Sequence, residues 1–185
     1  MNQAVFLDRD GTIIEDLGNL GSTSQVEFYH DSFSALQRLQ ERFLLFLVTN
    51  QRCIADGLVS RKQVDSVNDY VLAKLADQGV TITDVYVCPH KRAEGCQCIK
   101  PNTYFADIAA EKYDIDLKKS FSVGDHPHDV QLGVNFGGGG VYVMTGHGVK
   151  HFGELETDTI VTDGITQAVD HILTMDTQRQ AADNG

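Results

Sequence analysis

Short apolar runs alternate with stretches of helical periodicity along this chain. The runs have the length of β-strands and lie near residues 5–7, 43–49, 85–87, 120–125, 141–144 and 159–161. The segments between them predict helices at residues 31–42, 60–78, 102–113, from 128 onward, and up to about 175. Strands that alternate with helices form a mostly parallel sheet with helices on both faces. The sequence therefore predicts an α/β fold with a doubly wound sheet.

The chain has the size and composition of one globular domain. It contains 185 residues, of which 42% are hydrophobic and 22% charged, an ordinary balance for a folded domain. It has no internal repeat and no interdomain linker. We expect one domain over residues 1–176, followed by a polar tail at 177–185 that frays. The glycine-rich residues 12–28 lack a clean period and predict a flap or loop after the first strand.

The net charge limits the partners of this chain. Its 26 acidic and 15 basic side chains give a formal charge of −11 at pH 7, which repels nucleic acids and anionic membranes. A small anion can still bind where a local cation offsets the field. The longest apolar run, at 43–48, is too short to cross a bilayer, and no secretory signal pattern opens the sequence. We expect a cytoplasmic monomer that acts on a small molecule.

Polar or charged side chains follow four of the predicted strands. They are Asp8, Thr49, Asp125 and, beyond the third strand, Lys100. In open α/β sheets, ligands bind beyond the carboxyl ends of the strands, where the strand order reverses. We therefore expect these side chains to converge on one site.

The stretch DRDGT at 8–12 places two acids close together. Asp8 and Asp10 point the same way only if the backbone stays extended, and Arg9 would then point away from both. Because like charges raise each other's pKa, a positive group is expected between them. Together with Asp125 they offer hard oxygen ligands of the kind that bind Mg²⁺.

The same positions suit the transfer of a phosphoryl group. Thr49 and Asn50 supply neutral hydrogen-bond donors, and Lys100 supplies a compact positive charge. Asp8 can attack phosphorus once the metal and the lysine offset the repulsion between two anions. Asp10, protonated because its neighbour is acidic, can then give a proton to the leaving oxygen and later take one from water.

Four motifs resemble those of the haloacid dehalogenase (HAD) superfamily. They are DRDGT at 8–12, TN at 49–50, KP at 100–101 and GDHPHD at 124–129, in the family's order. The segments TNQ, CPH, CQC and KP are similar to those of subfamily IIIA, which includes heptose-bisphosphate and histidinol-phosphate phosphatases. The resemblance implies a HAD-like Rossmannoid fold with a minimal cap. It also implies a Mg²⁺-dependent phosphatase of a sugar phosphate or histidinol phosphate, working through an aspartyl phosphate in carbohydrate metabolism.

The resemblance also assigns roles to individual residues. Asp8 would be the nucleophile and Asp10 the general acid and base. The phosphate would be held by Thr49, Asn50, Gln51 and Lys100. The Mg²⁺ ligands would be Asp8, the Asp10 carbonyl and Asp125. Asp129 would orient the lysine or the waters on the metal.

A cluster of cysteine and histidine precedes Lys100. Cys88, His90, Cys96 and Cys98 form the pattern C-x-H-x5-C-x-C. Three thiolates and an imidazole make a closed tetrahedral set, which suits structural Zn²⁺ and leaves no open position for chemistry. The loop at 88–99 lacks predicted secondary structure, so the metal would fix it and the lysine behind it. Free buried thiols are the alternative interpretation.

Some positions depart from the family pattern. Ile99 stands where relatives commonly carry an arginine, Arg52 and Cys53 replace a small residue and a glycine, and Asp56 replaces a later arginine. These changes leave the catalytic group intact and leave the substrate open. We interpret Cys53 as structural. The four glycines at 137–140 predict a turn. His126, His128 and His147 have two interpretations, since they either line the cleft or are solvated loop residues, which is the commoner case.

Two other functions fit part of the pattern. A receiver-like signalling domain also carries a phosphorylated aspartate, but it has no use for a proton donor at Asp10. A catalytically silent, zinc-stapled interaction module would keep the zinc set and turn over no phosphate ester. Asp8 and Asp10 could also be strand-end acids that simply face water.

Overall fold

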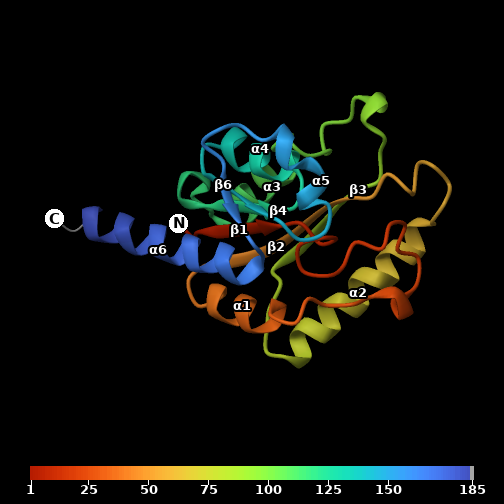
Figure 1. Cartoon of the computed structure of the whole chain (residues 1–185), viewed down its shortest axis with the longest axis horizontal. Helices are drawn as coiled ribbons and strands as arrows, with labels where there is room; N and C mark the ends of the chain where they lie inside the picture. Colours follow the sequence, from red (N-terminus) through yellow and green to blue (C-terminus); the bar gives the residue numbers. More distant parts are fainter. Residues whose placement is uncertain (184–185) are drawn as a thin grey trace.

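The computed structural model describes residues 1–183, which form a parallel sheet of six strands between two layers of helices (Figure 1). The strands are β1 (Ala4–Leu7), β2 (Leu44–Asn50), β3 (Asp84–Cys88), β4 (Phe121–Gly124), β5 (Gly139–Val143) and β6 (Ile160–Thr162). Their order in the sheet is β3-β2-β1-β4-β5-β6. The α-helices are α1 (Ser32–Leu39), α2 (Arg61–Asp77), α3 (Tyr104–Tyr113), α4 (Pro127–Asn135), α5 (Gly148–His151) and α6 (Ile165–Asp183). The predicted doubly wound α/β fold is confirmed.

The alternation of strand side chains builds a core on each face of the sheet. Val5 and Leu7 of β1 pack in one cluster with apolar residues of α1, α2 and α6. Phe6, between them in sequence, packs in a second cluster with residues of α3 and α4. Figure 1 shows these two helix layers on opposite sides of the sheet. The central strand is therefore apolar throughout, as expected for a parallel strand buried on both faces.

Local signals define two of the helix ends. Ser60 and Gln63 form the predicted capping box at the start of α2, and Gly79 follows the helix with a φ of +74°. His126 caps α4, where Pro127 occupies the first turn. The strand β4 thus leads through Asp125 directly into a helix.

The glycine run at 137–140 is only partly a turn. Gly137 has a φ of +81°, but Gly139 and Gly140 belong to β5. A Cβ on Gly140 would collide with the backbone of Val130 in α4. These glycines therefore allow a helix to pack closely on a strand, which a count of turn-forming residues does not reveal.

The last helix is longer than the sequence pattern predicted. Instead of ending near Met175, α6 continues to Asp183, so most of the expected tail at 177–185 is helical. Asp176 is buried and lies 2.6 Å from Arg42, and Arg179 lies 5.0 Å from the centre of the Phe121 ring. These tertiary contacts stabilise a segment whose own sequence is polar. Residues 184–185 lie outside the described part of the chain.

Within residues 1–183, no helix has both the length and the apolar composition needed to cross a membrane.

Candidate active site

The residues expected at the site converge on one cleft beyond the carboxyl ends of the strands. The strand order reverses between β1 and β4, and the cleft of about 490 Å³ opens there. Its lining includes Asp8, Asp10, Thr49, Asn50, Gln51, Lys100, Asp125 and Asp129. The topology therefore brings together segments that lie far apart in the sequence.

Lys100 is the central cation of the cleft. Its ammonium lies 2.8 Å from Asp8 and 2.6 Å from Asp129, and it donates to the Val48 carbonyl at 2.7 Å. Burial alone would lower the pKa of Lys100, but the charges of Asp129 and Asp8 outweigh burial and raise it above its usual range. Burial raises the pKa of Asp8 to about 7, against the opposing charge of Lys100. The lysine is thus a permanent positive charge beside a carboxylate that is costly to bury.

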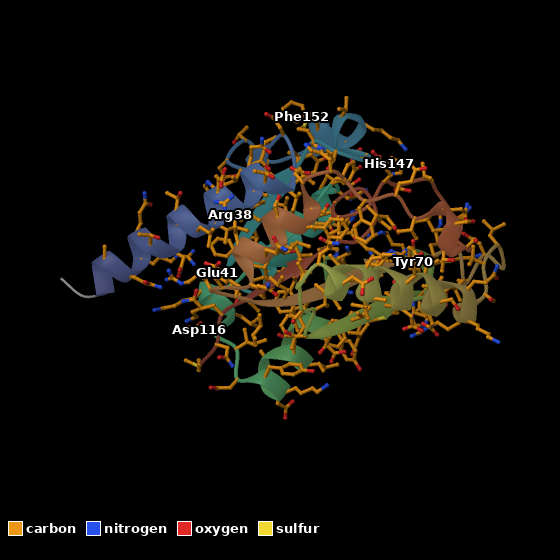
Figure 2. The ribbon with its side chains drawn as sticks, turned by 90° about the horizontal axis from the view of Figure 1, so that it is seen from below. Arg38, Glu41, Tyr70, Asp116, His147 and Phe152 are labelled. Atoms are coloured by element: carbon orange, nitrogen blue, oxygen red, sulfur yellow. The ribbon has the colours of Figure 1, made fainter. Side chains whose placement is uncertain are left out.

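Asp125 occupies a tightly packed position between β4 and α4. Its carboxylate accepts a hydrogen bond of 2.6 Å from the backbone of His147, which lies at the start of α5 (Figure 2). A Cβ on Gly11, which has a φ of +78°, would collide with this carboxylate, and so would one on Gly146. Burial raises the pKa of Asp125 to about 8, with a further contribution from the charge of Asp8. The two glycines therefore make room for the Asp125 carboxylate. Its charged form is unfavourable in this buried position unless a cation binds nearby.

The acids of the cleft fit a magnesium ion. One carboxylate oxygen each from Asp8, Asp125 and Asp129 lies within 4.8 Å of the others. Oxygen ligands are what Mg²⁺ prefers, and it needs only one or two carboxylates besides water and phosphate. Asp129 is held by both oxygens, since Lys100 contacts Oδ1 and the His126 N–H donates to Oδ2. The Lys100 contact of Asp8 uses Oδ1 and the His147 contact of Asp125 uses Oδ2, so these two side chains are the better candidates for the metal. Asp16, Asp125 and His147 form a second group of the same kind, which the sequence pattern did not reveal.

Arg9 points toward Asp10, contrary to the expectation from the sequence. It is fully buried, and its guanidinium binds both oxygens of Asp10 at 2.9 and 2.8 Å and the Asn68 side chain at 2.6 Å. The strand β1 ends at Leu7, so the alternation of extended backbone does not hold beyond it. The expectation that Arg9 points away from both acids is therefore wrong. The cation beside Asp10 comes from its own neighbour in the sequence.

Thr49, Asn50 and Gln51 follow Val48, and their side chains contact different parts of the site. Gln51 donates its amide hydrogens to Asp10 at 2.7 Å and to the buried Thr49 hydroxyl at 2.8 Å. Asn50 accepts a hydrogen bond of 3.1 Å from the backbone N–H of Lys100. Gln51 thus orients Asp10, while Asn50 holds the lysine segment against the end of β2.

The cysteine and histidine set is assembled at the end of β3. The three sulfur atoms of Cys88, Cys96 and Cys98 are 3.2 to 3.7 Å apart, and the His90 Nδ1 atom lies 3.3 Å from Cys98 and 3.8 Å from Cys88. Ligands placed tetrahedrally about 2.0–2.3 Å from one zinc ion are about 3.3–3.8 Å apart. The four residues therefore fit a zinc ion.

Three histidines stack at the edge of the cleft. The His126 ring lies 4.4 Å from the rings of both His128 and His151. Burial and the neighbouring His128 lower the pKa of His126 to about 4, and burial and the charge of Arg92 lower the pKa of His128. His126 and His128 are half-buried and line the cleft, so for both the cleft-lining interpretation holds and the solvated one does not. The sequence signal that was missed is the capping position of His126 before Pro127.

The departures from the family pattern all fall around this cleft. Arg52, Cys53 and Ile99 line it. Asp56 pairs with Arg52 at 3.1 Å and with Lys91 at 2.8 Å. The Cys53 thiol is buried and lies 3.5 Å from the Gln51 side-chain oxygen. The differences therefore change the wall of the cleft and leave its acids and lysine in place.

Comparison with known proteins gives several relatives. A family model described as HAD-hydrolase-like matches residues 97–172. The D-glycero-alpha-D-manno-heptose-1,7-bisphosphate 7-phosphatase of Campylobacter jejuni is 37% identical over 134 residues, covering 72% of this chain and 77% of that protein. The D-glycero-beta-D-manno-heptose-1,7-bisphosphate 7-phosphatase of Yersinia pestis is 36% identical over 168 residues, covering 85% and 89%. A crystal structure of D,D-heptose 1,7-bisphosphate phosphatase from B. bronchiseptica, complexed with magnesium and phosphate, has a TM-score of 0.85 at 29% identity and covers 94% of this chain and 99% of its own.

Proposed function

Because this chain belongs to the HAD superfamily and its relatives are sugar phosphatases, we propose that it is a Mg²⁺-dependent phosphomonoesterase that hydrolyses a heptose bisphosphate. The observation that carries this proposal is the convergence of Asp8, Lys100 and Asp125 in one cleft at the switch point of the sheet. Relatives that act on the alpha and beta anomers match with similar identity, so we propose the substrate class and no anomer.

Asp8 and Asp10 divide the chemistry between them. A carboxylate oxygen of Asp8 forms a bond to phosphorus while the bond from phosphorus to the sugar oxygen breaks, and Asp10 gives a proton to that oxygen. Asp10 then takes a proton from water, whose oxygen attacks phosphorus, releases phosphate and restores the Asp8 carboxylate. Arg9 and Gln51 orient Asp10 with one hydrogen bond to Oδ1 and two to Oδ2. Because a carboxylate oxygen can accept two hydrogen bonds, Oδ1 keeps a site for the proton.

Lys100 keeps Asp8 in place for this attack. Its ammonium contacts Asp8 directly, and its other partners are Asp129 and the Val48 carbonyl. The buried Thr49 hydroxyl is one donor that we propose for the phosphate oxygens. The Lys100 ammonium is the other, and because its three N–H groups already contact Asp8, Asp129 and Val48, it donates to phosphate in exchange for its contact with Asp8. Mg²⁺, held by the Asp8 and Asp125 side chains and the Asp10 carbonyl, would supply the positive charge that offsets repulsion between the carboxylate and the phosphate.

Replacement of Asp10 tests the division of roles. We expect Asp10→Asn to lower turnover by about 10²- to 10⁴-fold, because the leaving oxygen and the attacking water lose their proton partner. A phosphorylated enzyme should accumulate with a heptose bisphosphate, visible as a phosphoryl group added in intact-protein mass spectra. The surface variant Asp65→Asn is the control. Turnover at the wild-type rate in Asp10→Asn would contradict the proposal.

Wild-type behaviour separates the proposal from its two rivals. A receiver-like domain would keep a long-lived phosphoryl group on Asp8 without any substitution, whereas the phosphatase releases it. A silent zinc-stapled module would release no phosphate from any sugar phosphate in the presence of Mg²⁺. Release of phosphate that is abolished by EDTA and restored by Mg²⁺ supports the phosphatase alone.

The proposed Mg²⁺ site predicts how stability changes with pH. Burial raises the pKa values of Asp8 and Asp125 to about 7 and about 8, whereas an aspartate in an unfolded chain titrates near about 3.9. Between about pH 4 and pH 8 the folded, metal-free protein therefore binds more protons than the unfolded chain, and its free energy of unfolding falls as pH rises. Mg²⁺ stabilises the folded state in place of those protons.

Thermal denaturation with EDTA or with Mg²⁺ measures this dependence. We expect the increase in Tm caused by Mg²⁺ to be larger at about pH 8 than at about pH 6, because fewer protons must be displaced at the higher pH. Asp125→Asn should make the metal-free Tm less sensitive to pH and should reduce the Mg²⁺ effect. An increase in Tm that is the same at both pH values would contradict the assignment of these ligands.

We also propose that Cys88, His90, Cys96 and Cys98 hold a structural zinc ion. The set fits the ion and connects β3 to Lys100, since Cys98 precedes the lysine by two residues. Thiolates that remain free to bind zinc require a reducing compartment, so we propose the cytoplasm as the location.

Zinc content of purified variants tests the metal set. We expect Cys98→Ser to lose its zinc and to lower kcat/KM by at least about tenfold, because the metal no longer fixes the segment that carries Lys100. Cys53→Ser is the matched control: it replaces the remaining cysteine and should keep one zinc per chain. Zinc retained in full by Cys98→Ser would rule out this ligand set.

A further inference from the structure

The cationic side chains of the cleft differ in whether they form an ion pair with a carboxylate. Lys100 is paired with Asp8 and Asp129, and Arg52 is paired with Asp56. Arg92 also lines the cleft, and its side chain is exposed. Among the ion pairs of the described residues, Arg92 has no carboxylate partner. The lining of the same cleft includes five acids, all in the described part of the chain, and none of them forms an ion pair with Arg92.

The position of Arg92 is fixed from two directions. Its Nη2 atom donates a hydrogen bond of 3.1 Å to the Lys100 carbonyl, which ties the guanidinium to the residue that carries the central ammonium. The neighbouring Lys91 pairs with Asp56 at 2.8 Å, which ties the loop to the segment after β2. A side chain that is already positioned loses less conformational entropy when it binds a ligand.

The surroundings of Arg92 favour an anion over any other ligand. The remaining N–H groups of its guanidinium are suited to bind two oxygens of a phosphate at once. Ile99, which also lines the cleft, is buried and offers no competing polar group, and His128 brings an imidazole that can donate a hydrogen bond. The acids Asp8 and Asp125 lie at the sheet edge, whereas Arg92 stands on the loop between His90 and Cys96.

We propose that Arg92 forms a second anion subsite of the cleft, which binds the phosphate group of a sugar bisphosphate that the enzyme does not remove. This inference rests on the proposed function, because it assumes that the phosphate to be removed lies at Asp8. What it adds is the residue: it assigns recognition of the second phosphate to Arg92, since Ile99 beside Lys100 cannot bind an anion. Arg92 is a specificity residue and takes no part in bond breaking.

Two substrates that differ only in the second phosphate test this proposal. D-glycero-D-manno-heptose 1,7-bisphosphate and the corresponding 7-phosphate share the group to be removed. We expect the wild-type enzyme to prefer the bisphosphate, and Arg92→Gln to lower the ratio of the two kcat/KM values by about tenfold or more through KM. Arg92→Lys should restore part of the ratio. A ratio that Arg92→Gln leaves unchanged would overturn the proposal.

Arg52→Gln is the matched comparison for this experiment. Arg52 lines the same cleft but is held by Asp56, so its replacement should change the ratio much less than that of Arg92. An equal or larger change would assign the second subsite to Arg52 and overturn the role of Arg92. Arg61→Gln, on the surface of α2 and outside the cleft lining, controls for a general loss of positive charge.

A binding measurement separates failure of this inference from failure of the proposed function. Asp8→Asn protein is titrated calorimetrically with the bisphosphate and with the 7-phosphate, so no turnover is needed. Tighter binding of the bisphosphate, lost when Arg92→Gln is added, supports the subsite even if wild-type protein hydrolyses neither compound. Equal affinity for both compounds in the Asp8→Asn protein would overturn it, whatever the activity.

Discussion

Asp8→Asn is expected to lower kcat by about 10⁴-fold or more while leaving the protein folded. We propose Asp8 as the nucleophile, and an amide in its place can neither attack phosphorus nor form the acyl phosphate. Asp10 cannot substitute for it, because Arg9 and Gln51 hold both its oxygens. The measurement is phosphate release under single-turnover conditions, with mass spectrometry to detect any phosphorylated protein.

The stability of the same variant provides an independent readout. Burial raises the pKa of Asp8 to about 7, which means that folding disfavours its charged form in the absence of metal. We therefore expect Asp8→Asn in EDTA to have a Tm at about pH 8 that is equal to or higher than that of the wild type. Lys100 keeps Asp129 and the Val48 carbonyl as partners in this variant.

For the activity of Asp8→Asn, residual turnover within about tenfold of wild type would exclude Asp8 as the nucleophile.

Lys100→Met is expected to lower the free energy of unfolding by about 3–5 kcal/mol and kcat by about 10²-fold or more. The ammonium is buried between Asp8 and Asp129, and methionine fills a similar volume without the charge. Two carboxylates then remain in a buried site without their cation. Urea denaturation in EDTA measures the loss of stability, and phosphate release with Mg²⁺ measures the loss of activity.

A double substitution distinguishes the electrostatic cause from a packing defect. Adding Asp129→Asn to Lys100→Met removes one of the two unpaired charges, so it should recover part of the stability and none of the activity. If Asp129→Asn lowers the free energy of unfolding by the same amount in Lys100→Met as it does in the wild type, the two residues do not interact. That result would contradict the ion pair as the source of stability.

The convergence of the site could be predicted from the sequence because it follows from topology. Asp8, Thr49 and Asp125 each come at or directly after a parallel strand, and such strands end at one edge of the sheet. Lys100 was harder to place, because it follows β3 only through a loop, and the cysteine pattern supplied the reason to expect that loop to be fixed. The formal charge of −11 added the expectation of a small-molecule ligand in place of nucleic acid or an anionic membrane.

What the sequence could not predict depends on tertiary contacts. The direction of Arg9 is set by Asn68 of α2 and by the turn at Gly11, neither of which appears in a strand pattern. The helical continuation of α6 depends on Arg42, which is far from it in the sequence. The stacking of His126 likewise requires His151 from α5, so the sequence alone could not decide between a cleft-lining and a solvated histidine.

The loop from Cys88 to Lys100 has a consequence for how this protein can diverge. Its two ends are tied to the sheet by Cys88 in β3 and by the bond from Asn50 to the Lys100 backbone, while Arg92 lies in the stretch between His90 and Cys96. Mutations in that stretch can alter the chemistry offered to incoming molecules without displacing the reactive groups. If Arg92 has the role that we propose, the preference for a substrate and the rate of the chemical step can be altered by separate substitutions.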